Sequence, residues 1–459
     1  MTGLSGTRIF ASAVSLVAAT ATTAPLVAQT PSGGGSDPLA AIVAEALENN
    51  LGLAQESLAV ERAEAGVREA RGRFFPALSL DSRYSEQTGT LNLGDFVNPA
   101  YAALNQVTGT NQFPTDLDVT LPLAHDTRFR LVQPLFDASI LAGHALARHT
   151  RDGQRLAHGT AARRLAAEAQ SAFLEVGAAR SARRTWEATL ALVTESERVA
   201  QRLVDAGRAT PDQVLRARAD LSDVEQRLDE ARQTEDAAAR ALNRILRRSL
   251  DAPVDELPDS VLRFEIALSE EQAVASALAR REELSQSDAG VRAADAGVRL
   301  ASASFLPSVG LALDYGFQGS DLGFSGDDDY AVASVVLSWS LSIGGSDRAR
   351  RSAARADAER LRLRRAELED LVRLDVRQAY DAAVVARDAI GTAGARLAAA
   401  RRSFELVRRR YEEGLATQVE FLDARTAYTS AELNRVATAY RYAIRYVDLE
   451  RAAALRDLT

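Results

Sequence analysis

The sequence predicts a mainly α-helical protein that also carries β-strands of membrane-spanning length, with one structural unit used twice. Two helix-ending glycines, Gly207 and Gly414, are each followed three residues later by a threonine. Residues 46–76 align without a gap onto residues 277–307, and a proline ends both segments. After each proline, the period of the apolar residues changes from helical to two, as in a strand. These observations predict an internally duplicated chain of helix, strand, strand, long helix, tip and helix.

The N-terminal residues 1–28 have the pattern of a secretory signal peptide. Arg8 precedes the apolar run 9–19, and small residues follow up to Ala28. A membrane anchor is the weaker alternative, because the run is shorter than the ~20 residues of a spanning helix. Residues 29–37 are rich in glycine and serine, which predicts a flexible start to an exported chain.

The composition favours close-packed helices over a bulky globular core. Aromatic residues make up only 6% of the 459 residues, and alanine supplies much of the 46% that are hydrophobic. The net charge of −8 gives no support for nucleic-acid binding. The absence of cysteine excludes disulfides, thiolate catalysis and cysteine-ligated metals.

The first structural repeat is predicted over residues 38–252. Apolar residues at helical spacing indicate one helix from Pro38 to Arg73. The other predicted elements of this repeat are strands near 78–84 and 128–135, a long polar stretch near 86–126 between them, and helices over about 138–207 and 211–248.

The second repeat is predicted over residues 270–459, after a linker at 253–269 that contains Pro253 and Pro258. At 1.5 Å per residue, the long helix of each repeat reaches on the order of 100 Å. Helices of this length are stable only when they pack on neighbours, as in a coiled coil. The predicted elements after the helix at 277–307 are strands near 309–317 and 335–341, a short loop between them, and helices over about 346–414 and 418–456.

The strands set a condition on how the chain assembles. Each repeat offers two strands of roughly the ~9–11 residues that cross a bilayer. Two strand pairs cannot close a barrel, and lipid does not tolerate open sheet edges. Three copies would supply twelve strands, which predicts a trimeric 12-stranded β-barrel continued by a long α-helical barrel. A soluble β-sandwich with attached helices is the alternative, and the ~100 Å helices argue against it.

Both tips have the residues that end one helix and begin the next. Each tip glycine suits the left-handed conformation at the end of a helix. Thr417 with Glu420, and Thr210 with Gln213, have the spacing of a capping box. Pro211 suits the first position of the returning helix, where its missing N–H costs nothing. The sequence therefore predicts two helical hairpins with similar tips.

The order, duplication and spacing of these features resemble the TolC-type family of outer-membrane efflux proteins. The segments that carry the resemblance are the two Gly-x-x-Thr tips, the stretch 411–424 and the strand end Gln-Pro-Leu-Phe-Asp at 133–137. The resemblance covers nearly the whole mature chain, from about residue 38 to 456. It implies a homotrimeric channel in the outer membrane that extends into the periplasm. It also implies a periplasmic adaptor and an inner-membrane transporter as partners, with export of drugs, metals, small molecules or proteins.

The resemblance further implies that acidic side chains at Glu420 and Asp423 ring the periplasmic entrance. The two residues share a helix face, so three copies would form a charged ring that selects among solutes. For Glu420, its place in a capping box is the favoured interpretation. Asp423 lies one turn further along the helix, so the sequence favours a place in the pore for its carboxylate.

In the resembling family, polar links between the two tips close this entrance. Tyr411 is kept from that pattern, but the acidic partner is replaced by Gln213 and an expected arginine by Ala416. We hypothesise a neutral hydrogen bond between Tyr411 and Gln213, and packing of Tyr411 between helices is an equally weighted alternative. Ordinary turn chemistry is the alternative to adaptor docking at the tips. By resemblance, the docking residues are Gly207, Arg208, Ala209, Thr210, Gly414, Leu415, Ala416 and Thr417.

Neither catalysis nor a cofactor is predicted, because the sequence has no phosphate loop, nucleophile elbow or plausible acid/base pair. Three of the four histidines fall on a predicted helix, but their spacing does not place them on one face as metal ligands. The exit duct of a type I protein secretion system is the alternative to an efflux duct. A secreted structural coiled-coil protein is less favoured, since the alternating strands argue against it.

Overall fold

The computed structural model describes residues 37–86, 91–118, 120–121, 124–258, 262–319, 322–324 and 328–456. The predicted signal peptide, residues 1–28, lies outside them. The chain divides into the units Met1–Asp37 and Pro38–Thr459, and the second unit contains all the helices and strands described below.

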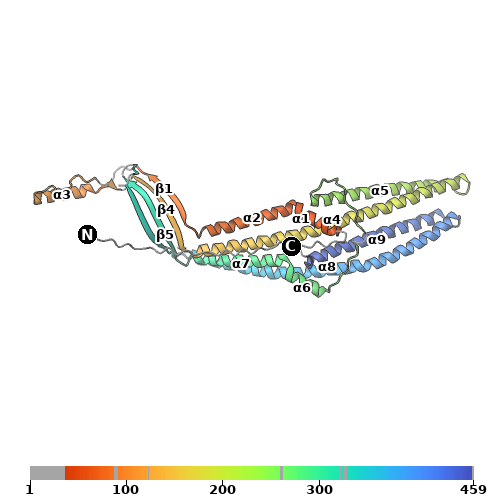
Figure 1. Cartoon of the computed structure of the whole chain (residues 1–459). Coiled ribbons are helices and arrows are strands. Elements are labelled where there is room, and N and C mark those ends of the chain that lie inside the picture. The colour runs from red at the N-terminus through yellow and green to blue at the C-terminus, as the bar shows by residue number, and fades with distance from the viewer. Residues whose placement is uncertain are drawn as a thin grey trace, which may run out of the picture. The chain divides into compact units, whose positions relative to one another are not determined.

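Each repeat contains two shorter helices, two strands of one sheet and a long helical hairpin (Figure 1). The first repeat consists of α1 (Pro38–Asn49), α2 (Leu51–Gly72), β1 (Ala77–Tyr84), β4 (His125–Phe136), α4 (Ala138–Asp205) and α5 (Pro211–Leu246). The second repeat consists of α6 (Glu270–Arg280), α7 (Glu282–Ala303), β5 (Ser308–Gly319), β6 (Asp329–Ser338), α8 (Ser346–Glu412) and α9 (Gln418–Ala452).

The two long helices confirm the predicted hairpins. α4 has 68 residues and α8 has 67, and each ends two residues before a glycine of positive φ. Within the second unit, the hairpin tips lie at the opposite end from the strands (Figure 1). None of the described helices is both long enough and apolar enough to cross a membrane.

The helix predicted over residues 38–73 is wrong in one respect, because it is two helices. The break falls at Asn50, whose side chain accepts hydrogen bonds from the N–H groups of Gly52 and Leu53 at 2.8 and 3.3 Å. Its amide also donates to the carbonyl of Ile245 at the end of α5, at 3.2 Å. The second repeat breaks at the aligned position, Arg281, between α6 and α7. The duplication therefore includes this bend.

The strands form one antiparallel sheet in the order β1-β4-β5-β6. β4 and β5 pair along almost their whole length, so the strand pairs of the two repeats join side by side. β1 and β6 are the edge strands of this sheet. β6 begins at Asp329 and ends at Ser338, so the alternation that was predicted to continue to 341 runs beyond the strand.

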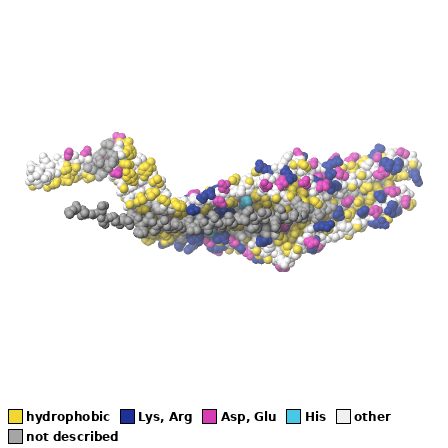
Figure 2. All heavy atoms as spheres, viewed as in Figure 1, with side chains coloured by type: hydrophobic (Ala, Val, Ile, Leu, Met, Phe, Trp, Pro, Cys, Tyr) yellow, Lys and Arg dark blue, Asp and Glu magenta, His cyan; other side chains and the backbone are white. Residues whose placement is uncertain are grey.

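The pairing register separates a charged face of the sheet from an apolar one. Asp81 lies opposite Arg128, and Arg130 lies opposite Asp314 with their charged groups 3.4 Å apart. On the other face, Leu80 lies opposite Phe129. Figure 2 shows the contrast with the helices, whose surface carries interspersed arginine and acidic side chains, while much of the strand surface is apolar.

A helix interrupts the segment that was predicted to be a long polar stretch at 86–126. α3 (Gly94–Thr108) lies between β2 (Leu91–Asn92) and β3 (Thr120–Leu121), which pair with each other. The side-chain amide of Asn98 donates to the carbonyl of Leu117 and accepts from the N–H of the same residue, at 2.9 Å each. Asn105 binds the backbone of Phe113 in the same way. These polar residues, which suggested a loop, instead attach the helix to the returning chain.

The core lies where the short helices pack on the hairpins. One cluster joins α1, α4, α5 and α9 around Phe173 and Leu174, and a second joins α6, α8 and α9 around Val372 and Val376. Most of the other core residues are alanine, which lets the helix backbones approach closely. The core therefore fixes how the two hairpins lie beside each other and where their tips end.

Candidate functional site at the hairpin tips

The second tip forms as the sequence predicts. Gly414 has φ +77°, and the N–H of Leu415 donates to the carbonyl of Arg410 at 2.7 Å, which closes α8. The Thr417 hydroxyl accepts from the N–H of Glu420 at 3.3 Å, and the Glu420 carboxylate accepts from the N–H of Thr417 at 2.7 Å. This reciprocal pair is a complete capping box.

The first tip differs from its prediction. Gly207 has φ +67° and ends α4 as expected. The capping box predicted for Thr210 and Gln213 is wrong, because the Thr210 hydroxyl donates to the carboxylate of Asp212 and caps no N–H. Pro211 at the first helical position has no N–H, so this helix begins with one fewer backbone donor that needs a partner.

The two acidic residues at the start of α9 have different surroundings. Glu420 is held by the capping box, and hydrogen bonding from the Thr417 backbone and hydroxyl lowers the pKa of its carboxyl group. Asp423 is exposed one turn further along the helix, and no hydrogen bond or ion pair involves it in the described part of the chain. Among the described residues, the carboxylate of Asp423 is therefore exposed and unpaired, whereas that of Glu420 caps α9.

Tyr411 is buried between helices, with 7% of its surface exposed. Its ring stacks on Phe421 with the ring centroids 4.9 Å apart, and Phe404 completes the aromatic cluster. The hydroxyl has no hydrogen-bond partner among the described residues, so the predicted bond to Gln213 is not formed. Burial raises the pKa of the Tyr411 phenol. In this structure Tyr411 therefore packs between helices, which is the alternative to the predicted hydrogen bond.

Gln213 contacts the second hairpin through its backbone. The side-chain amide of Gln418 donates to the Gln213 carbonyl at 2.7 Å. Ala416 lies half-buried against the aromatic cluster around Tyr411. The predicted docking residues are otherwise exposed at the two tips, except for half-buried Ala209, and Leu415 has 65% of its surface exposed.

An ion pair that the sequence analysis missed links the hairpins two turns deeper. Arg425 of α9 donates to the carboxylate of Asp220 of α5 at 2.8 Å, and both side chains are largely buried. Burial raises the pKa of the Asp220 carboxyl group, and Arg425 only partly opposes this effect. Thr189 of α4 and Thr429 of α9 lie within 3.3 Å of each other nearby. The inner faces of the hairpins are therefore polar as well as apolar.

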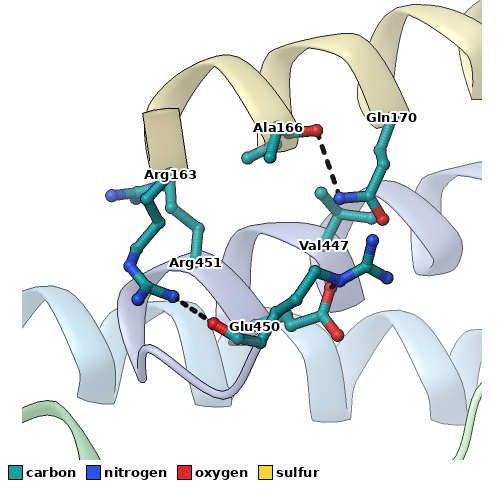
Figure 3. Close-up of a pocket in the computed structure, with 8 residues that line it drawn as sticks. Arg163, Ala166, Gln170, Val447, Glu450 and Arg451 are labelled. Carbon is teal, nitrogen blue, oxygen red and sulfur yellow. Dashed lines mark hydrogen bonds and ion pairs between the residues drawn. The ribbon is translucent and has the colours of Figure 1, made fainter. Parts of the chain in front are cut away.

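One pocket where α4 and α9 pack together, away from the tips, is small. Figure 3 shows a cavity of about 10 Å³ between α4 and α9, and such a volume holds no more than about one water molecule. Arg163 fills its edge by binding the carboxylate of Glu282 and the carbonyl of Arg456. In the described part of the chain, no group of three or more histidine, aspartate or glutamate residues could hold a metal ion.

The fold is shared with solved structures of outer membrane proteins. The Campylobacter jejuni outer membrane channel CmeC has 17% identity and a TM-score of 0.73, over 90% of this chain and 85% of that chain. The Vibrio cholerae outer membrane protein VceC has 17% identity and a TM-score of 0.73, over 90% of this chain and 95% of that one. A membrane protein from Pseudomonas aeruginosa has 20% identity and a TM-score of 0.73, over 90% of this chain and 93% of that one. The chain thus has the fold of an outer membrane channel.

The family follows from the sequence itself. A family model described as outer membrane efflux protein matches residues 42–246 and 273–455, which is most of the chain. No curated protein sequence matches the sequence of this chain. The chain belongs to the outer membrane efflux protein family. It is a channel protein and not an enzyme, as the sequence predicted.

Proposed function

We propose that three copies of the chain form one channel through the outer membrane and across the periplasm. Their sheets would close into a twelve-stranded barrel, and their hairpins would continue it as a helical tube. Substrates would pass through it passively from an inner-membrane transporter and a periplasmic adaptor to the exterior. Family membership and the fold support this function for the assembled chain.

The open edges of the sheet are the observation that most favours assembly into one barrel. β1 and β6 leave one side of each strand without a partner in the sheet, and β1 is exposed along its whole length. β4, β5 and β6 have 12, 12 and 10 residues, which suits a tilted crossing of the bilayer. Because lipid does not tolerate unpaired backbone groups, β1 of one chain would pair with β6 of the next.

The charged face of the sheet would line the water-filled interior, and the apolar face would contact lipid. Asp81, Arg128, Arg130 and Asp314 share the first face, while Leu80 and Phe129 belong to the second. This assignment agrees with the separation of charge that the pairing register produces.

At the other end of the tube, Asp423 of three chains would surround the periplasmic entrance. Its exposure and freedom from ion pairs support a role in attracting cations. Glu420 would add to the same ring while it caps α9. The exposed residues of both tips, from Gly207 to Thr210 and from Gly414 to Thr417, would dock a helical hairpin of the adaptor.

Closure of the entrance would depend on how the tips pack. Tyr411 would contribute its ring, stacked on Phe421, and Gln213 its backbone carbonyl, bound by Gln418. This differs from the hydrogen bond between Tyr411 and Gln213 that the sequence suggested.

Fractionation and conductance together test the proposed function. The full-length protein should appear in the outer-membrane fraction as a detergent-stable trimer. After reconstitution into planar lipid bilayers, it should conduct ions in discrete steps. A soluble monomer, or a membrane protein without conductance under any condition, would contradict the channel.

A further inference from the structure

The four junctions between the helices and the sheet lie at one end of the sheet. α2 leads into β1 and α7 leads into β5, while β4 leads into α4 and β6 leads into α8. Neighbouring strands are antiparallel, with Ala77 opposite Val132 and Ser308 opposite Ser338, so the four connections meet at the same end (Figure 1). In the proposed channel, this end of the sheet faces the periplasm.

Positive charge is concentrated at this end, although the whole chain has a net charge of −8. The two helical turns nearest the sheet and their links to the strands comprise residues 66–76, 137–144, 297–307 and 339–352. They contain three acidic residues and seven arginines, which we call the junction arginines: Arg68, Arg71, Arg73, Arg299, Arg348, Arg350 and Arg351. The connections at the other end of the sheet, residues 85–124 and 320–328, contain seven acidic residues and no arginine or lysine. The two ends of the sheet therefore differ in the sign of their charge.

Most of the junction arginines are available to a ligand. Six of the seven are exposed, and Arg351 is half-buried over the ring of Phe305, 5.0 Å from its centroid. Arg73 and Arg350 pair with acidic residues of their own helices, at 3.0 and 3.2 Å. The other four have no side-chain hydrogen bond or ion pair among the described residues: Arg68, Arg71, Arg299 and Arg348. Contacts within the chain therefore do not explain why these positions are basic.

The start of α8 is an unfavourable place for cations in the helix itself. The N-terminus of a helix carries partial positive charge, which repels arginines in the first turns. Arg348, Arg350 and Arg351 nevertheless occupy the first two turns of α8, where Asp347 is the acidic residue, and Arg355 follows one turn later. An anion bound here would offset this repulsion.

An exposed apolar segment joins β6 to these arginines. Trp339, Leu341 and Ile343 have 57%, 69% and 100% of their surfaces exposed. They continue the alternation of Val335 and Leu337 in β6. Tryptophan is favoured at the level of the lipid headgroups. A membrane that covers this segment would place its headgroups at the start of α8, within reach of long arginine side chains.

We propose that the junction arginines, together with Arg355, bind the phosphate groups of anionic phospholipids in the leaflet of the outer membrane that faces the periplasm. The proposal rests on the proposed channel function, which places the sheet in this membrane. Arginine suits the role because its guanidinium group donates two parallel hydrogen bonds to a phosphate. At physiological ionic strength the attraction extends about 8 Å, so it acts on headgroups directly beside the helices. The bound lipid would fix the depth of the sheet in the bilayer.

Quenching of Trp339 fluorescence measures which lipids surround the junction arginines. The chain has two tryptophans, so Trp186→Phe leaves Trp339 as the single indole. The full-length protein with this change is reconstituted into equimolar vesicles of phosphatidylcholine and phosphatidylglycerol, in which one lipid or the other carries bromine. Bromine quenches indole only at short range, so the two preparations report the local abundance of each lipid.

Two further variants in this background identify the arginines responsible. The test variant replaces three exposed arginines at the start of α8: Arg348→Gln, Arg350→Gln and Arg355→Gln. The matched control replaces three exposed arginines of the same helix, about 70 Å further along: Arg401→Gln, Arg402→Gln and Arg409→Gln. Both variants lose the same charge, so a difference between them depends on position.

We expect brominated phosphatidylglycerol to quench Trp339 severalfold more strongly than brominated phosphatidylcholine, both without further changes and in the matched control. The preference should disappear in the test variant, and also in about 1 M salt, where charges are screened beyond about 3 Å.

The outcomes separate the lipid site from the channel. Equal quenching by the two lipids before any arginine is replaced would overturn the lipid site and leave the channel in place. An undiminished preference in the test variant would do the same, as would an equal loss in the matched control. If neither brominated lipid quenches Trp339, the sheet does not lie in the membrane, and the proposed function itself is contradicted.

Discussion

The hydroxyl group of Tyr411 does not form the polar link to the first hairpin that the sequence suggested. It lies in an aromatic cluster with Phe404 and Phe421 and finds no partner among the described residues. A buried hydroxyl without a hydrogen bond costs about 1–3 kcal/mol of desolvation. The ring, in contrast, contributes through stacking and burial. The two parts of this side chain should therefore have opposite effects on stability.

We predict that Tyr411→Phe leaves the conductance unchanged and leaves thermal stability unchanged or slightly higher. Tyr411→Ala, which removes the stacked ring, should lower the free energy of unfolding by about 3 kcal/mol, as other large-to-small core changes do. Calorimetry of the purified protein measures the stability. A rise in conductance for Tyr411→Phe would reinstate a polar link between Tyr411 and the first hairpin.

The acidic pair at the start of α9 allows capping and selectivity to be separated. Glu420→Gln removes a charge but keeps the capping box, since glutamine also serves at this position. Asp423→Asn removes a charge from a side chain that has no hydrogen-bond or ion-pair partner among the described residues. Both variants should lower the preference for cations over anions, measured as the reversal potential in a salt gradient, with Asp423→Asn the stronger. Unchanged selectivity in Asp423→Asn would exclude the acidic ring.

The capping box also predicts how the tip responds to acid. Hydrogen bonds lower the pKa of the Glu420 carboxyl group below its ordinary value of 4.5. A carboxylate with a depressed pKa adds stability above its unfolded pKa, and that stability is lost as the pH falls through the folded value. Protection of the α9 N-terminus from hydrogen exchange, corrected for intrinsic rates, should thus hold at pH 5 and decline only below 4.5. Glu420→Gln should remove this pH dependence, and a decline that began near pH 6 would contradict the assignment.

At the scale of elements, the bend between α1 and α2 depends on Asn50. Its side chain caps α2 and also binds the end of α5. Among the described residues, the side chain of the neighbouring Asn49 bonds only to the carbonyl of Glu45 in its own helix. We predict that Asn50→Ala lowers the free energy of unfolding by about 1–2 kcal/mol, the usual cost of a lost N-cap. Asn49→Ala is the matched control and should have little effect. Equal losses in thermal denaturation would show that Asn50 does not fix the bend.

Much of the element order could be predicted from the sequence, because glycines, prolines and a change of period mark the ends of the long elements. The hairpin tips at Gly207 and Gly414 and the strands after Pro76 and Pro307 are examples. α3 could not be recognised, since its asparagines and glycine are typical of loops until their partners on residues 113 and 117 are known. The end of β6 could not be predicted, because the alternation of apolar residues continues past Ser338.

The site was less predictable than the fold, because its contacts join residues far apart in sequence. The capping box of Thr417 and Glu420 is local in sequence, and its prediction is confirmed. The capping box predicted for Thr210 is wrong, because the Thr210 hydroxyl binds the carboxylate of Asp212 instead. The Arg425–Asp220 pair depends on the register between two hairpins. The duplication gave no signal for it, because Arg425 aligns with another arginine, Arg218, when Gly414 is aligned with Gly207.

At the scale of the whole molecule, the exposed apolar side chains indicate surfaces that the single chain leaves uncovered. Leu363, Leu371 and Leu374 on α8 are each more than half exposed, and so is Val385 further along the same helix. Exposed apolar surface of this extent on a helix is typical of an interface with another chain. Together with the open edges of β1 and β6, it favours assembly of the helices and the strands in the same oligomer.

The number and arrangement of chains in the assembled protein decide whether the sheets close into one barrel. Electron cryomicroscopy of the full-length protein in lipid nanodiscs gives both. We predict three chains around one axis, with β1 of each chain hydrogen-bonded to β6 of the next and the charged face of the sheet turned inward. A monomer with free strand edges, or an oligomer whose sheets remain separate, would contradict the account.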